Sequence, residues 1–167
     1  MRKQIRYLLI LSFFLAFQHS YAQSTDELPV EILKDFDGNS APKTLLNNDG
    51  KPVILSFWAT WCAPCLQELK SIQGIYADWQ KESGVKLIAV SIDRERQLPR
   101  VKQLVEKRKW PFEVYMDSDG EFRTALNVVN IPHTFVLDGK GNVIYQSTSY
   151  SPGDEKKLYE KVKTASD

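Results

Sequence analysis

Cysteine, methionine and histidine are scarce in this sequence, and each occurs only twice among its 167 residues. His19 falls in a leader-like segment, so two cysteines and one histidine remain downstream of it. Closed structural zinc sites use four ligands, and this set does not supply them. We therefore expect neither a metal site nor a cofactor.

Long runs of like charge are also missing. No five like charges follow one another, and Lys107-Arg108-Lys109 is short enough to be a solvated helix end. Without Arg2, Lys3 and Arg6 of the leader, 19 basic residues face 21 acidic ones, a net charge of −2. This balance predicts neither nucleic-acid binding nor attraction to acidic membranes. Internal repeats and low-complexity segments are absent, and the length suits one domain.

The leader has the three parts of a secretory signal peptide. Basic residues come first, the apolar run Tyr7–Phe17 is too short to span a bilayer comfortably, and Ser20-Tyr21-Ala22 is a small-x-small cleavage site. We expect residues 1–22 to be removed and the mature protein to be exported, to a periplasm, without lipid on a cysteine. An uncleaved membrane anchor is the alternative, and the mass of the mature N-terminus distinguishes the two.

The rest of the chain alternates short apolar runs with amphipathic stretches, which predicts an α/β fold with a mixed sheet flanked by helices. Helices are expected from Cys65 to near Gly84, around Leu98–Val105, around Phe122–Leu126, and after Ser151. Core strands are expected at Val53–Phe57, Val85–Ile92, Phe112–Met116, Thr134–Leu137 and Val143–Tyr145, the last two as a hairpin. Residues 23–35 are expected to be a tail or edge strand, with a further short strand at Lys43–Leu46, and residues 36–167 form the domain.

Both cysteines lie where the first core strand passes into a helix. A disulfide between Cys62 and Cys65 would close a very small loop and add little stability, so catalysis explains the pair better. At a helix N-terminus, the unpaired N–H groups and the macrodipole stabilise a Cys62 thiolate, which makes Cys62 the expected nucleophile. Pro64 fits the first helical turn, where no N–H donor is needed. Cys65 would be the more buried, resolving thiol.

Glu68 lies three residues beyond Cys65 on the same helix. Helical side chains lean toward the N-terminus, so its carboxyl group can point back at the cysteine pair. A partly buried carboxyl group has a raised pKa, which suits proton exchange with a thiol. The alternative is a solvated glutamate in a surface ion pair.

These residues resemble the exported TlpA/ResA-like thiol–disulfide oxidoreductases of the thioredoxin superfamily, from about residue 36 to residue 162. The similarity rests on Phe57-Trp58-Ala59-Thr60-Trp61-Cys62-Ala63-Pro64-Cys65, on Glu68, on Val90-Ser91-Ile92-Asp93 and on Ile131-Pro132 before a strand ending in Asp138-Gly139. It implies a thioredoxin-like fold with an N-terminal β extension, and a cis peptide bond before Pro132.

The resemblance also implies partners. It favours a monomeric reductant of protein disulfide or dithiol substrates, recharged by a membrane electron donor such as a thiol-reducing transmembrane protein, and possible service in cytochrome c maturation. The direction of electron flow is not readable from the sequence, because about 30 mV changes the equilibrium tenfold.

Several further residues are expected to surround the cysteines. Ser56 occupies the strand position where thioredoxins usually carry a buried aspartate, and this places the burden of proton exchange on Glu68 or water. Asp93 is expected merely to start a loop. The expected substrate-binding residues are Trp61, Ala63, Pro64, Ile131, Pro132 and His133, with Ile131 offering its backbone to an extended segment. Trp58 is expected to pack in the core, and core packing of both tryptophans stays open. His133 could sense a thiolate or have no role.

Two other activities compete with this interpretation. Soft thiolates and imidazole suit Cu(I), so Cys62, Cys65 and His133 could form a copper site, although no methionine cluster supports copper transfer. A peroxidase of the peroxiredoxin type is the other, and such enzymes lack a Cys-x-x-Cys pair at the catalytic helix. Copper titration and peroxide consumption discriminate these from disulfide exchange.

Overall fold

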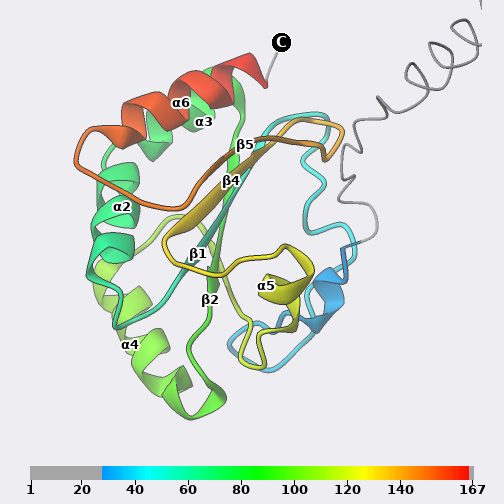
Figure 1. The fold of residues 1–167 in the computed structure, drawn as a ribbon, viewed down its shortest axis with the longest axis vertical. Coiled ribbons are helices and arrows are strands. Elements are labelled where there is room, and N and C mark those ends of the chain that lie inside the picture. The colour runs from blue at the N-terminus through cyan, green and yellow to red at the C-terminus, as the bar shows by residue number, and fades with distance from the viewer. Residues whose placement is uncertain (1–27, 166–167) are drawn as a thin grey trace, which may run out of the picture.

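A five-stranded mixed sheet forms the centre of the computed structural model, which describes residues 28–165. Its strand order is β3-β2-β1-β4-β5 (Figure 1). β1, β2 and β3 run parallel, whereas β4 and β5 run antiparallel to their neighbours. The strands are β1 (Val53–Trp58), β2 (Lys86–Ser91), β3 (Glu113–Met116), β4 (His133–Leu137) and β5 (Val143–Ser147). The predicted mixed sheet and its closing hairpin are therefore confirmed.

Helices cover one face of the sheet, and this face carries the cysteine pair. They are α2 (Ala63–Gln73), α3 (Tyr76–Ser83), α4 (Leu98–Arg108) and α6 (Asp154–Thr164) (Figure 1). We call the core beneath them the helix-side core. It combines Ile54 and Trp58 of β1 with Leu69 and Ile72 of α2 and with Val162 of α6.

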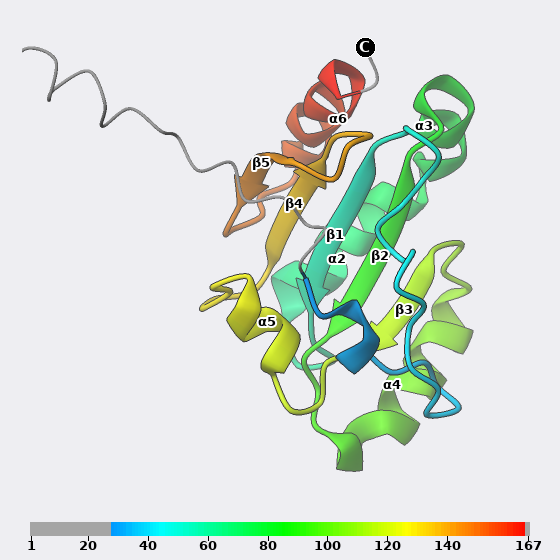
Figure 2. The same cartoon turned by 90° about the vertical axis from the view of Figure 1, so that its right-hand side faces the viewer.

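The opposite face is covered by α5 (Glu121–Ala125) and by the segment before β1, which includes the 3-10 turn Val30–Ile32 (Figure 2). A second core lies here, between alternate residues of β1, β2 and β4 and the buried side chains Val30, Leu33, Leu45 and Phe122. Because both faces are covered, all six residues of β1 are buried, which explains its continuous apolar character.

The helix predicted from Cys65 to Gly84 is in fact two helices. α2 ends at Gln73, Gly74 caps it, and Ile75 leaves the helical conformation before α3 begins at Tyr76. The apolar spacing runs across this break without interruption, so the periodicity does not reveal it. The predicted end at Gly84 is correct, since Gly84 adopts the left-handed conformation that favours glycine.

The segment before β1 is less regular than predicted. Residues 29–36 form the 3-10 turn and single antiparallel bridges from Lys34 to Ser40 and to Met116 of β3, instead of a regular edge strand. Residues 43–46 form turns, so the strand predicted at Lys43–Leu46 is wrong. Leu45 is nevertheless buried, and burial of one side chain accounts for that apolar pair without a strand. The predicted signal peptide and tail, up to residue 27, lie outside the described residues.

No helix within residues 28–165 has the length and apolar character needed to cross a membrane.

Gly139, at the β4–β5 hairpin, lies against the backbone that enters β1. A Cβ atom there would lie 2.0 Å from the carbonyl oxygen of Gly50, so this close approach requires glycine. We expect Gly139→Ala to lower the free energy of unfolding by about 1–3 kcal/mol, as overpacking does. Urea unfolding measures this. Gly74→Ala is the control, because its Cβ would meet only an ordinary contact at 3.6 Å, and an equal loss in both variants would contradict the steric explanation.

Candidate active site

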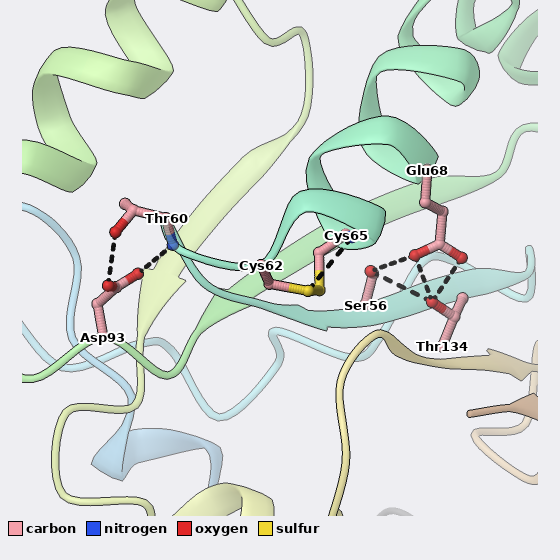
Figure 3. The surroundings of a disulfide bond; sticks show 7 residues. All are labelled: Ser56, Thr60, Cys62, Cys65, Glu68, Asp93 and Thr134. Carbon is pink, nitrogen blue, oxygen red and sulfur yellow. Dashed lines mark hydrogen bonds between the residues drawn. A yellow bond between two sulfur atoms is a disulfide. The ribbon is translucent and has the colours of Figure 1, made fainter. Parts of the chain in front are cut away.

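The cysteine pair lies where β1 ends and α2 begins. Cys62 is the N-cap residue of α2, and it is joined to Cys65 by a disulfide (Figure 3). The backbone N–H of Cys65 donates to the Cys62 sulfur over 3.3 Å. Cys62 is 5% exposed and Cys65 is fully buried, which is the expected order. Only Cys62 can therefore meet a large substrate first.

The N-terminus of α2 favours negative charge on the Cys62 sulfur. α2 has eleven residues, and its first turn contains no acidic residue that would oppose the macrodipole. Pro64 occupies that first turn at no cost in hydrogen bonds. Once the disulfide opens, the same N–H groups are available to a Cys62 thiolate.

Glu68 is buried, which excludes the solvated surface glutamate. It is 4% exposed, and its carboxyl group lies 3.4 Å from the Ser56 hydroxyl and 3.0 Å and 3.1 Å from the Thr134 hydroxyl (Figure 3). Desolvation by burial raises the pKa of Glu68 from 4.5 to about 7, although the two hydroxyl groups favour the ionised form. The group can therefore bind or release a proton near neutral pH.

The two hydroxyl groups come from neighbouring strands. Ser56 of β1 and Thr134 of β4 are directly opposite each other in the antiparallel register, so both side chains project toward α2. Thr134 was missed from the sequence, and Ser56 was considered only as the absence of an acid. A lone hydroxyl residue inside each of two buried apolar strands was the available signal.

Asp93 does not merely start a loop. It is fully buried after β2, where its side-chain oxygens accept from the Thr60 N–H over 2.8 Å, the Thr60 hydroxyl over 2.8 Å and the Ser91 hydroxyl over 2.9 Å (Figure 3). β1 and β2 are parallel and end at the same edge of the sheet. Asp93 thus holds the loop that leads from β1 to Cys62.

The segment around Pro132 adjoins that loop. The Ile131–Pro132 peptide bond is cis, which confirms the expectation from the resemblance. Within residues 28–165, the backbone N–H and C=O groups of Ile131 have no hydrogen-bond partner. Ile131 and Trp61 line one groove of about 520 Å³, together with Val129. Trp61 is 59% exposed and Val129 is 84% exposed, so the groove presents apolar side chains to solvent. The sequence analysis missed Val129.

The other predicted residues separate into two groups. Ala63 and Pro64 are exposed next to Cys62, whereas Trp58 is buried against Trp110 in the predicted core position. His133 is 5% exposed and stacks on Phe135.

His133 lies away from the cysteine pair. It is opposite Phe57 in the β1–β4 register, so its ring lies on the face of the sheet away from α2. Its Nε2 lies 3.1 Å from the Gln146 side chain, and burial lowers its pKa. The structure does not bring His133 together with the cysteines. In the described part of the chain, no three His, Cys, Asp or Glu side chains are grouped to hold a metal ion.

Comparison with known proteins agrees with this geometry. The AhpC/TSA family profile matches residues 25–146. Sporulation thiol-disulfide oxidoreductase A of Bacillus subtilis is 29% identical over 92% of each chain. Thiol-disulfide oxidoreductase ResA of Bacillus thuringiensis subsp. konkukian is 34% identical over 72% of this chain and 66% of that relative. A solution structure of a thioredoxin-like protein from Porphyromonas gingivalis has 46% identity and a TM-score of 0.73, covering 86% of this chain and 94% of that one.

The dithiol pair at the helix N-terminus, the cis peptide bond beside it and these relatives agree on one chemistry. The chain belongs to the AhpC/TSA family, and it is a thioredoxin-like thiol–disulfide oxidoreductase of the ResA/StoA type.

Proposed function

We propose that this oxidoreductase is exported and reduces disulfides of client proteins, with Cys62 as nucleophile, Cys65 as resolving thiol and Glu68 as proton acceptor. The observation that carries the proposal is the buried carboxyl group of Glu68, whose pKa burial raises to about 7. Resolution requires a group that takes the proton of Cys65 near neutral pH, and Glu68 lies one helical turn beyond that residue.

Catalysis begins with the Cys62 thiolate, which attacks one sulfur of the client disulfide. The client's other sulfur leaves as a thiolate, and a mixed disulfide joins Cys62 to the client. Cys65, freed of its proton, then attacks the Cys62 sulfur. The Cys62–Cys65 bond forms, the bond to the client breaks, and the client has gained two electrons.

The groove beside the disulfide supports binding of an extended client segment. The unpaired N–H and C=O groups of Ile131 suit strand-like pairing with a client backbone, in the manner of β-augmentation. Trp61 and Val129 offer apolar contact on the rim, and the exposed Ala63 and Pro64 border Cys62. Because backbone pairing is independent of sequence, these apolar side chains would provide the selectivity.

Export is supported by the basic residues, apolar run and cleavage site in residues 1–22, and we propose that this segment is removed as a signal peptide. Outside the cytoplasm disulfides persist, so a reductant needs electrons from elsewhere. A membrane protein that passes electrons from cytoplasmic thiols would supply them. We propose that the mature protein acts as a monomer in the periplasm.

The proposed pathway is cytochrome c maturation, on the strength of the resemblance to TlpA/ResA-like proteins. The client would then be an oxidised Cys-x-x-Cys-His segment, whose two cysteines must be thiols before haem attachment. Cys65→Ser traps the client as a mixed disulfide on Cys62, and mass spectrometry identifies it. Recovery of clients without such a segment would reject this pathway and leave the oxidoreductase activity untouched.

The direction of electron flow follows from the reduction potential of the Cys62–Cys65 pair. We expect a value close to that of thioredoxin, roughly −270 mV, measured by equilibration with glutathione buffers. A value near roughly −120 mV, as in strongly oxidising relatives of the superfamily, would overturn the reductant role. Cys62→Ser is the matched control, since it cannot form the disulfide.

A further inference from the structure

The proton that leaves Cys65 has no direct route to solvent. Cys65, Ser56 and Thr134 are at most 1% exposed, and Glu68 is 4% exposed. No hydrogen bond within residues 28–165 joins the Glu68 carboxyl group to either cysteine sulfur; its oxygens bond instead to the two hydroxyl groups. Figure 3 shows the Ser56 hydroxyl between the disulfide and the carboxyl group of Glu68.

The hydroxyl groups can exist in two arrangements because each carries a single proton. Thr134 Oγ1 lies 3.2 Å from Ser56 Oγ and about equally far from both Glu68 oxygens, so it can donate to either residue. When Glu68 is ionised, both hydroxyl groups donate to its carboxylate. When Glu68 is protonated, it can donate to Thr134 and Thr134 to Ser56, which leaves the Ser56 proton free to point at Cys65.

We propose that the Ser56 hydroxyl relays the proton from Cys65 to Glu68, and that Thr134 stabilises the protonated end of this relay. The inference rests on the proposed role of Glu68. In the resolving step the Cys65 thiol gives its proton to Ser56 Oγ, while the Ser56 proton passes to Glu68 Oε2. The Cys65 thiolate then attacks the Cys62 sulfur, the client leaves as a thiolate, and Glu68 holds the proton.

The relay assigns a function to the serine that replaces a buried acid on β1. A serine is a poor acid or base near neutral pH, but it needs no net change of protonation to pass a proton along. The acid has thus moved from the strand to α2, and the hydroxyl group bridges the gap that this leaves.

A single-turnover experiment separates the two chemical steps. The reduced protein is mixed with an aromatic disulfide whose thiolate is coloured: attack by Cys62 releases the first coloured thiolate, and resolution by Cys65 releases the second. We expect Ser56→Ala to leave the first release unchanged and to slow the second by roughly 10²-fold, the usual contribution of general acid–base catalysis. The second release should also lose its plateau near neutral pH and rise with hydroxide, because solvent must then deprotonate Cys65.

Three variants make the test decisive. Ser83→Ala removes a buried hydroxyl of α3 remote from the cysteines and should leave both releases unchanged. Glu68→Gln should slow the second release as Ser56→Ala does, and the double variant should be no slower than either, because members of one relay act as a unit. A wild-type second release in Ser56→Ala, or multiplied losses in the double variant, would overturn the relay. A wild-type second release in Glu68→Gln would instead remove the proposed proton acceptor.

Discussion

Replacing Glu68 by glutamine is expected to stabilise the oxidised protein by about 3 kcal/mol at pH 8, and to change its stability little near pH 4. Burial raises the pKa of Glu68 from 4.5 to about 7. The folded protein therefore keeps this proton up to about pH 7, whereas the unfolded chain releases it near its ordinary pKa. Between these values the folded state binds more protons, and stability falls as pH rises. Glutamine cannot ionise, so it escapes the loss.

Urea unfolding of the oxidised protein between pH 4 and pH 9 measures this difference. The disulfide stays closed, so neither cysteine titrates, and the charged groups close to Glu68 are limited to Asp154 and Tyr150 of the neighbouring α6 region. Glu106→Gln, on the exposed side of α4, is the matched control and should stay within about 0.5 kcal/mol of the wild type throughout. A stability difference that does not change with pH would show that Glu68 is ionised like a surface glutamate.

The same substitution should slow catalysis, so stability and activity should move in opposite directions. Glutamine keeps the shape and the contacts with Ser56 and Thr134 but cannot accept the Cys65 proton. Residues that stay destabilising in the resting state while serving a chemical step are common at active sites. A variant that is stabilised and equally fast would mean that the buried carboxyl group has no role in turnover.

The sequence predicted the strands well because their burial on both faces leaves continuous apolar runs. Val53–Trp58 and His133–Leu137 were placed to within a residue or two. The break between α2 and α3 was missed because Ile72 and Tyr76 continue one helical face across Gly74. A single glycine does not distinguish a helix that bends from one that ends.

The cysteine pair and cis Pro132 were identified from motifs, whereas the environment of Glu68 was not. Helical spacing orients Glu68 toward the cysteines but does not say what covers it. That depends on the register of β1 against β4, which sets Ser56 opposite Thr134 across 78 residues of sequence. Long-range register is the information that local patterns lack, and the burial and pKa of Glu68 follow from it.

Asp93 is the second position where we expect a large effect. Asp93→Ala should lower the free energy of unfolding by about 2–4 kcal/mol, because it leaves the buried Thr60 N–H and the Ser91 hydroxyl without their acceptor. The loss should extend to catalysis, since the Thr60–Trp61 loop positions both Cys62 and the rim of the groove. The first release of coloured thiolate, which reports attack by Cys62, should therefore slow along with the second.

Two milder variants separate the contacts that Asp93 makes. Thr60→Val removes the hydroxyl bond but keeps the N–H bond, and Asp93→Asn keeps the shape and one acceptor oxygen, so each should lose less stability than Asp93→Ala. Chemical unfolding measures the stabilities, and the first release measures the position of Cys62. If Asp93→Ala lost stability but kept the wild-type rate of first release, Asp93 would serve the fold alone, and the Cys62 loop would be held by its other contacts. If the rate fell in proportion to the lost contacts, the loop's position would be set from β2, through a residue 31 positions beyond the cysteine it serves.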